Sequence, residues 1–439
     1  MKLNYKRTIL IGFAFLSISA FWQMYDTVIP LILDYTFHLG ETLTGVVMAT
    51  DNVLALFLLP LFGVWSDRCN TPLGRRTPFI YVGTVLSAGL LLLLHFQDRP
   101  GHLAGFIIVL FLLLLSMSLY RSPAVALMPD LTPPPLRSKG NAVINLMGAV
   151  GFIFALVMIK ILGGEANASP SYLPLFLTIA GLMILSIIIL AATISEKKLL
   201  KQVEEECRGA GISMDPIPNE PTFDEPEETA KKTLARLPKD VRRSLLMLLF
   251  SVAFWYIAYN AVTTAFSRYA YRIWKIGNDF TLPLLIASAA AVVSYLPIGI
   301  LSGRIGRKKM ILTGIVMMAA SYAFLATCGT YSTTLIIFFV LIGFGWAAIN
   351  VNSLPMVVDM CEPEDIGRFT GYYYTFSMAA QVITPIASGA LLQYVHYRTL
   401  FPYSVCFMLL AFLTMSFVRH GDSKPEAKGS LLEHFDAGD

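Results

Sequence analysis

Two acidic side chains, Asp26 and Asp51, stand inside apolar stretches of this chain. Asp26 lies about eight residues before the end of the first stretch and Asp51 about eight residues after the start of the second, so helices rising about 1.5 Å per residue place both about 12 Å below one surface. Carboxylates at one depth on adjacent helices can share a proton or pair with a cation. An acid inside a membrane is costly, which makes both residues functional candidates. A side chain facing water at the interface is the open alternative.

Two basic side chains could balance these acids. Arg121 falls near the end of the fourth apolar stretch and Arg268 near the end of the seventh. Each could pair with a buried carboxylate, or each could extend its guanidinium to the membrane surface and leave only its stem in the apolar layer. Both arginines are therefore binding-site candidates, with the second alternative open for each.

Aromatic and amide groups on nearby stretches fit a sugar. Sugar rings have apolar faces that stack on aromatic rings, and their hydroxyls bond to amides and carboxylates. Aromatic residues in such stretches also commonly pack against lipid or a neighbouring helix. Unpaired amides are harder to dismiss, because hydrocarbon penalises them. The candidates are Trp22, Tyr25, Tyr259, Asn260, Asn350 and Asn352.

The elements that must position these residues are membrane-spanning helices. Charged residues are 14% of the chain and hydrophobic ones 56%, whereas a soluble domain carries about 25% charged residues. Stretches long enough to cross a bilayer, about 20 residues each, recur along the chain. Twelve are expected, at 8–33, 44–65, 78–96, 103–122, 141–162, 172–194, 245–267, 279–302, 310–328, 332–354, 370–393 and 399–418. The predicted fold is an all-α polytopic membrane protein with twelve transmembrane helices.

The distribution of Lys and Arg predicts the orientation of these helices. Basic residues concentrate in the segments that share a side with the N-terminus, which places both termini in the cytoplasm and the protein in the plasma membrane. The cluster Arg268, Arg272 and Lys275 runs against this rule, so burial of part of it is expected. The net charge of +4 is explained by basic helix ends and gives no reason to expect nucleic acid. Five scattered cysteines predict neither a disulfide framework nor a metal site, and no cofactor is expected.

A charged loop that occurs twice indicates a duplicated architecture. Its two leading glycines are 236 positions apart, more than half the chain. A second similarity between the two halves is an Asp–Arg pair, which follows the fourth stretch and occurs again after the tenth. The first copy contains Gly63, Asp67, Arg68, Gly74, Arg75 and Arg76, with Asp130 and Arg137 after it; the second contains Gly299, Arg304, Gly306 and Arg307, with Asp359 and Arg368 after it. Gly303 replaces the acid in the second copy.

The chain is expected to divide around one polar segment. Residues 1–194 form a first six-helix bundle and 245–418 a second, pseudo-symmetric one. Residues 195–244 are dense in charge, which is typical of a solvated cytoplasmic linker, and 419–439 form a polar tail.

These features resemble a known family. The pattern G-x-x-x-D-R…G-R-R between the second and third stretches, the twelve spans and the central loop look like the major facilitator superfamily. The insertion between Arg68 and Gly74 and the run from Arg121 to Asp130 resemble the glycoside–pentoside–hexuronide:cation symporters, particularly the sucrose:proton symporters. The resemblance implies alternating access and a central cavity lined by spans one, seven and ten. It also implies that the two loops act as gates, with Asp67 as a latch confined to the first copy.

The predicted function is proton-coupled symport of a disaccharide or other glycoside by a monomer in the lipid bilayer. Sodium coupling stays open, as does the direction of transport. One alternative is a proton-coupled exporter of amphiphilic molecules; another is a transporter-like sensor that binds ligand without moving it. No Walker loop, Ser/His/Asp set or metal-ligand spacing occurs in the sequence, so an enzyme is not expected.

Overall fold

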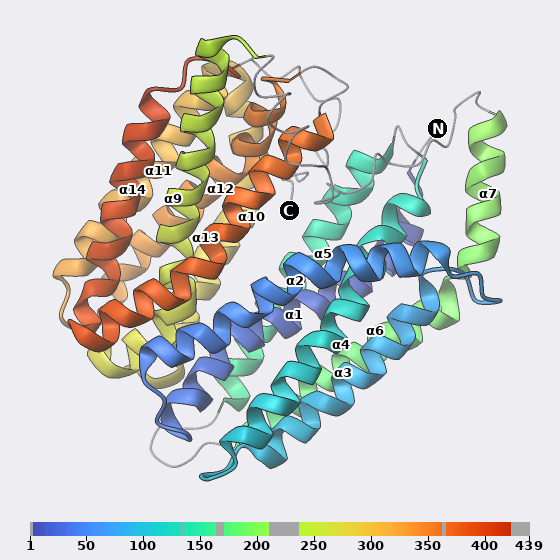
Figure 1. Ribbon diagram of the computed structural model, residues 1–439, viewed down its shortest axis with the longest axis horizontal. Coiled ribbons are helices and arrows are strands. Elements are labelled where there is room, and N and C mark those ends of the chain that lie inside the picture. The colour runs from blue at the N-terminus through green and yellow to red at the C-terminus, as the bar shows by residue number, and fades with distance from the viewer. Residues whose placement is uncertain (1–2, 134–135, 164–170, 210–236, 362–365, 423–439) are drawn as a thin grey trace. The chain divides into compact units, whose positions relative to one another are not determined.

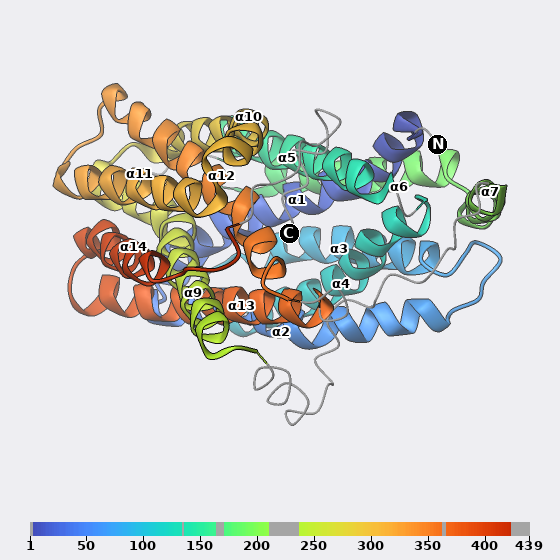
Figure 2. The same cartoon turned by 90° about the horizontal axis from the view of Figure 1, so that it is seen from above.

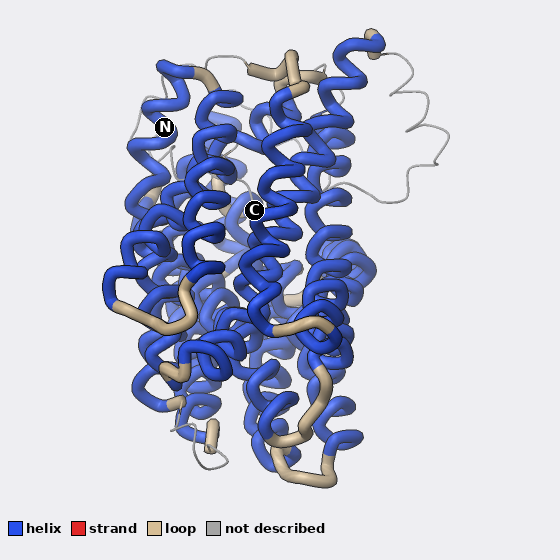
Figure 3. The backbone as a smooth tube through the Cα atoms, turned by 90° about the vertical axis from the view of Figure 1, so that its left-hand side faces the viewer, coloured by secondary structure: helices blue, strands red, loops and turns tan. Residues whose placement is uncertain are grey.

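A computed structural model describes residues 3–133, 136–163, 171–209, 237–361 and 366–422. Throughout these ranges the backbone consists of helices joined by short loops (Figure 3). The first seven helices are α1 (Tyr5–Tyr35), α2 (Glu41–Arg68), α3 (Thr77–Gln97), α4 (Leu103–Asp130), α5 (Arg137–Leu162), α6 (Leu173–Thr193) and α7 (Glu196–Gly209) (Figure 1).

The second half repeats the series of long helices. These are α9 (Lys239–Tyr269), α10 (Thr281–Ile305), α11 (Arg307–Thr327), α12 (Ile336–Val358), α13 (Ile366–Tyr394) and α14 (Leu400–Ser416). Short pieces connect them: the π-helix η2 (Ala270–Trp274), and the 3₁₀ turns η3 (Gly277–Phe280), η4 (Thr333–Leu335) and η6 (Tyr397–Thr399).

Twelve helices among the described residues are long and apolar enough to cross a membrane. Because hydrocarbon offers no hydrogen-bond partner to the backbone, an apolar chain of this length must satisfy its amides within helices. The sequence predicted these twelve, and that prediction is confirmed, with ends shifted by a few residues. The polar segment after the sixth span also begins with a helix, α7, which the linker prediction did not include.

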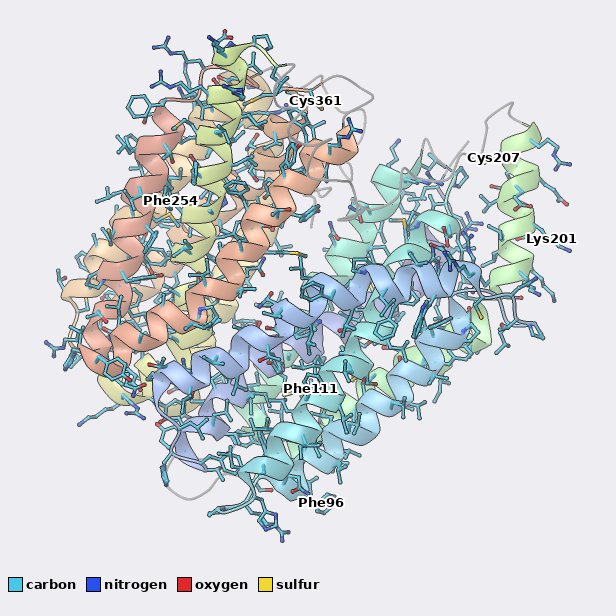
Figure 4. All side chains as sticks on the ribbon, viewed as in Figure 1. Phe96, Phe111, Lys201, Cys207, Phe254 and Cys361 are labelled. Carbon is cyan, nitrogen blue, oxygen red and sulfur yellow. The ribbon has the colours of Figure 1, made fainter. Side chains whose placement is uncertain are left out.

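Large apolar side chains cover the outside of the bundles. Phe96 on α3 and Phe111 on α4 are 55% and 43% exposed, and Phe96 lies at the outer edge of the helices in Figure 4. Exposed aromatic and aliphatic surface of this kind is unfavourable in water but matches lipid. The hydrophobic residues therefore serve both the bundle core and the lipid contact.

The chain splits into two compact units. Unit 1 comprises Met1–Gly40, Thr50–Asp215 and Ile276–Leu285; unit 2 comprises Glu41–Ala49, Pro216–Lys275 and Ile286–Asp439. The start of α2 thus belongs to unit 2, and the start of α10, with η3, belongs to unit 1. In unit 1 the salt bridge of Lys160 with Asp279, 3.7 Å long, attaches that segment to α5.

Helix packing within the two units is the same. In unit 1, α1 packs on α5 and α6, and α3 packs on α4 and α6. In unit 2, α9 packs on α13 and α14, and α11 packs on α12 and α14. These helices also lie side by side in Figures 1 and 2. These are corresponding pairs in two series of six spans. The duplication read from the charged loops is therefore present in the three-dimensional packing.

Candidate functional site

The polar residues predicted in the first spans come together inside unit 1. Asp26 on α1, Asp51 on α2 and Arg121 on α4 are all half-buried. Their charges lie within electrostatic reach of one another. The Arg121 guanidinium lies 5.7 Å from the centre of the Trp22 ring, a cation–π contact. Arg121 therefore faces the acids and the indole, and the alternative of a guanidinium extended to the membrane surface is wrong for this residue.

A small cavity marks the centre of this cluster. Its polar lining comes from Trp22, Asp51, Asn52, Ser118 and Arg121, and its volume is about 20 Å³. The Asn52 side-chain amide donates a hydrogen bond of 2.8 Å to the Asp51 carboxylate. A space of this size holds about one water molecule. It can take one water or one hydroxyl of a ligand, but not a sugar ring.

Two buried donors beside the cavity lack a hydrogen-bond partner among the described residues. They are the indole Nε1 of Trp22 and the hydroxyl of Tyr25. The two rings meet edge to face, with centroids 5.4 Å apart, and the Tyr25 side chain is fully buried. Buried polar atoms nearly always find a partner, so an unpaired pair calls for a water or a ligand group.

Unit 2 contains an aromatic cluster that the sequence located only in part. Tyr259 on α9 stacks flat on Trp346 of α12, with centroids 3.7 Å apart and planes inclined by 5°. Tyr256 meets the same indole edge to face at 5.5 Å. The side-chain nitrogen of Asn260, next to Tyr259, is buried without a hydrogen-bond partner among the described residues. The cluster thus combines a pair of stacked aromatic rings with a buried amide donor on the residue that follows Tyr259.

The two asparagines of α12 differ from each other. Asn352 is buried, and its amide donates to the Ala348 carbonyl at 2.8 Å, so that donor is engaged within its own helix. Asn350 is half-buried. Trp346 lies four residues before Asn350 and hence on the same helix face. That spacing was the signal from which Trp346 could have been found.

Arg268 pairs with an acid that the sequence did not single out. Its Nε lies 2.8 Å from a carboxylate oxygen of Glu41, the first residue of α2, and both side chains are buried. The hydroxyl of Tyr397 also donates to Glu41. All three residues belong to unit 2. The surface alternative for Arg268 is thus wrong, and the expected burial of part of the Arg268, Arg272 and Lys275 cluster is found.

The first charged loop is a dense ion-pair network inside unit 1. Arg76 is its centre, 2.5 Å from Asp67 and 3.0 Å from Asp130. Arg75 pairs with the same Asp130 at 2.9 Å. Arg76 also donates to the carbonyl of Gly63 and to the Ser66 hydroxyl. Arg68 ends α2 with an exposed side chain, and Arg137 donates to the Pro129 carbonyl.

A residue of the linker helix completes this network. Glu196, the first residue of α7, is buried and accepts hydrogen bonds from the backbone amides of Arg75, Arg76 and Thr77. A carboxylate at the N-terminus of α3 satisfies amides that have no partner in the helix and interacts favourably with the helix dipole. Along α7, Lys201 is exposed and Cys207 is buried (Figure 4).

The second loop repeats the central ion pair in unit 2. Arg307 pairs with Asp359 as Arg75, the residue after the matching glycine, pairs with Asp130. Ser302 donates to the Gly299 carbonyl as Ser66 does to that of Gly63. Asp422, after α14, accepts from the amide of Lys308 at 2.9 Å, in the position that Glu196 has after α6. The expected asymmetry is therefore partial: the pair of Arg75 with Asp130 is repeated, whereas Lys308, in the place of Arg76, donates its Nζ to the carbonyls of Ser416 and Val418. Of the remaining candidates, Arg304 is exposed, Arg368 is half-buried and Gly306 precedes α11.

A family model decides the class of this protein. The model described as Major Facilitator Superfamily matches residues 11–273 and 276–435. The chain belongs to the Major Facilitator Superfamily. This superfamily is one of membrane transporters, so the predicted superfamily is confirmed, as is the prediction of a transporter family rather than an enzyme.

Curated proteins that resemble the chain carry the names of sugar transporters and match it over short stretches. Sucrose transport protein SUC3 of Arabidopsis thaliana is 30% identical over 153 residues, which are 30% of this chain and 24% of that protein. Sucrose transport protein SUT3 of Oryza sativa subsp. japonica is 27% identical over 34% of this chain and 33% of that protein. Proton-associated sugar transporter A of Mus musculus is 32% identical over 30% and 19%. The matches thus span between about a fifth and a third of each relative.

Solved superfamily structures share the fold across nearly the whole chain. A nucleoside transporter superposes with a TM-score of 0.69 at 15% identity, covering 95% of this chain and all of that one. A peptide transporter in complex with alafosfalin has a TM-score of 0.69 at 13% identity, covering 94% and 93%. Identities this low establish the fold alone. The predicted superfamily fold is confirmed.

A wider hollow of about 560 Å³ in unit 2 lies apart from the predicted residues. Its lining includes Arg272, His396 and Arg398, and it is open to the surface. No residue predicted for the superfamily's substrate site lines it. The enclosed cavity beside Asp51 combines opposite charges, an amide and an indole within the membrane-spanning helices. The small cavity is therefore the candidate site.

Proposed function

We propose that this protein takes up a disaccharide or related glycoside together with a proton by alternating access. The observation that carries the proposal is the cavity in unit 1 where Asp51, Asn52, Arg121 and Trp22 meet. Charged side chains are rare in transmembrane helices and mark ion or substrate pathways. The sugar transporters among the similar proteins support the choice of substrate class.

Charge balance explains why one proton suits this cluster. Asp26 and Asp51 carry two negative charges when ionised and Arg121 carries one positive charge, so the set has a net charge of −1. Binding one proton makes it neutral, which lowers the cost of holding it in a low-dielectric membrane interior. A cluster that is neutral only when protonated can change conformation with the proton bound and resist doing so without it.

Hydrogen bonding explains why a sugar suits the same region. The donors of Trp22 and Tyr25 lack partners among the described residues, and Asp26 and Asp51 supply acceptors. A polyhydroxyl ligand can serve both, because each hydroxyl donates and accepts. One hydroxyl fits the space beside Asp51. In unit 2, the stacked Tyr259 and Trp346 rings offer the kind of apolar face on which a pyranose stacks.

We further propose that the protein is a monomer of the plasma membrane with both termini in the cytoplasm. The support is the concentration of Lys and Arg in the segments on the side of the termini. On this orientation α1 ends and α2 begins at the outer surface, and the two charged loops face the cytoplasm.

Uptake by the purified protein in sealed vesicles tests the function. Labelled sucrose and maltose are offered with an inward proton gradient, with a sodium gradient, and with neither. We expect the proton gradient to drive the accumulation of one of these sugars to about tenfold the level in vesicles without a gradient. Flux that does not depend on the proton gradient, or no flux of any glycoside, would contradict the proposal. A thermal shift with hydrophobic cations and none with sugars would instead identify an exporter.

A further inference from the structure

The strongest unassigned feature of unit 2 is the buried ion pair at the start of α2. The Arg268 and Glu41 side chains are 4% and 5% exposed, and their charged atoms lie 2.8 Å apart. Tyr397, on η6, donates its hydroxyl to the other carboxylate oxygen of Glu41, and the Arg272 guanidinium lies over the Tyr397 ring at 4.7 Å. Three separate elements, α2, α9 and η6, thus converge on one carboxylate.

Backbone contact surrounds this pair. A side chain at Gly45 would meet the Pro385 carbonyl at 2.1 Å, and one at Gly389 would meet the Glu41 carbonyl at 2.4 Å. The amide of Thr42 donates to the Gln393 side chain at 2.9 Å. Glycines that allow backbones to touch are typical of tight helix contacts in membranes. The first turns of α2 are therefore in close contact with α13.

The energetics of such a pair suit a contact that must open and close. Two charges that leave water for a dry contact lose solvation, and their attraction roughly compensates that loss. Separating the pair into water therefore costs little. An apolar contact of the same size has no such compensation and would favour the closed state, while one charge left alone in the closed state is strongly unfavourable.

We propose that Glu41, Arg268 and Tyr397 form the outer gate of the transport cycle. The gate is closed in this structure, and it opens when the Glu41–Ala49 segment of α2 separates from α9 and α13. Glu41 and Arg268 position the gate rather than bind the substrate. This inference rests on the proposed alternating-access function, but its test does not depend on which substrate is moved.

Accessibility of a buried position tests the gate. Thr44, one turn into α2, is fully buried in the closed state, so a Thr44→Cys substitution in an otherwise cysteine-free protein reports opening through its rate of maleimide labelling. Glu41→Gln leaves Arg268 unpaired in the closed state, and the labelling rate should rise about tenfold or more. The swap Glu41→Arg with Arg268→Glu should return it to the starting rate. Glu41→Leu with Arg268→Leu should keep labelling at or below that rate and slow transport.

The controls separate gating from damage. Asp279→Asn removes the exposed ion pair of Asp279 with Lys160 in unit 1 and should leave labelling unchanged. Each variant is checked for a single elution peak and a cooperative thermal unfolding transition. Folded Glu41→Gln protein that labels at the starting rate would overturn the gate, as would a double-leucine variant with normal transport. If the gate responds while no glycoside is transported, the gate stands and the substrate proposal fails.

Discussion

In the proposed function, Asp51 serves both the proton and the ligand. Its carboxylate accepts from Asn52, faces the Arg121 guanidinium and borders a space for one water-sized group. With these partners the ionised Asp51 carboxylate is not isolated in hydrocarbon, and it is not held in a close ion pair either. A carboxylate in such a position can release and take up a proton without a large rearrangement.

Replacing the acid by its isosteric amide separates coupling from binding. With Asp51→Asn, sugar accumulation driven by the proton gradient should fall by about tenfold or more, because the cluster no longer has a group that titrates there. Sugar exchange at equal pH on both sides should persist. Uptake and counterflow in the same vesicles measure the two activities.

Asp98→Asn is the matched control, since Asp98 lies in the loop after α3, outside the membrane spans. Its accumulation should equal that of the unmodified protein. Full accumulation by the Asp51→Asn protein would show that the proton is carried elsewhere.

Short charged elements at the bundle ends hold the long helices in register. Glu196 links α7 to the start of α3, and Asp422 links the segment after α14 to the start of α11. Sequence patterns revealed the helices and the doubled loop, because hydropathy and glycine spacing are local signals. They did not reveal Glu196 or Glu41, whose partners lie 119 to 121 and more than 220 positions away. Such contacts follow from tertiary packing and leave no periodicity in the chain.

Loss of the Glu196 carboxylate should release α7. Burial raises the pKa of the Cys207 thiol, with Glu206 acting in the same direction and Arg137 opposing, so the thiol is protonated at neutral pH and reacts slowly. Glu196→Ala removes several charge-assisted hydrogen bonds, about 2 kcal/mol or more, and should expose Cys207. Maleimide labelling of Cys207 should then speed up at pH 7, and for the unmodified protein it should rise as pH rises.

Glu204→Ala provides the comparison, because Glu204 is exposed on the same helix. It should leave the labelling of Cys207 unchanged. Equal labelling rates for the Glu196 and Glu204 variants would mean that the Glu196 contacts do not hold α7.

At the scale of the molecule, the two units use one packing plan with different chemistry. The paired helices correspond one to one, and Arg75–Asp130 corresponds to Arg307–Asp359. The intramembrane acids and Arg121 occur in unit 1, whereas the stacked Tyr259 and Trp346 occur in unit 2. The two copies thus share their helix packing but differ in the polar and aromatic side chains that they carry inside.

The repeated loops predict independent effects of their glycines. Gly74 and Gly306 have φ values of 126° and 95°, which side chains rarely adopt, so Gly306→Ala should destabilise the protein by about 1–2 kcal/mol. Gly74→Ala should destabilise it by more, because its Cβ would also overlap the buried Glu196 side chain. Their effects should add in the double variant, because the positions lie in separate units. Thermal unfolding in detergent measures this. Gly89→Ala, in open space on α3, should stay within about 0.5 kcal/mol of the unmodified protein. A double variant no less stable than either single one would refute independence.

The exchange of short segments between the units also sets the order in which the protein can finish folding during synthesis. Domains of a nascent chain generally fold as units, the N-terminal one first. Unit 1 contains Ile276–Leu285, so it stays incomplete until the ribosome has passed the start of α10. The Glu41–Ala49 segment, made early, has to wait for α9 and α13 before its close contacts exist. Until then the carboxylate of Glu41 must stay in contact with water or with the insertion machinery. The first turns of α2 are therefore the last part of the early chain to reach their final contacts.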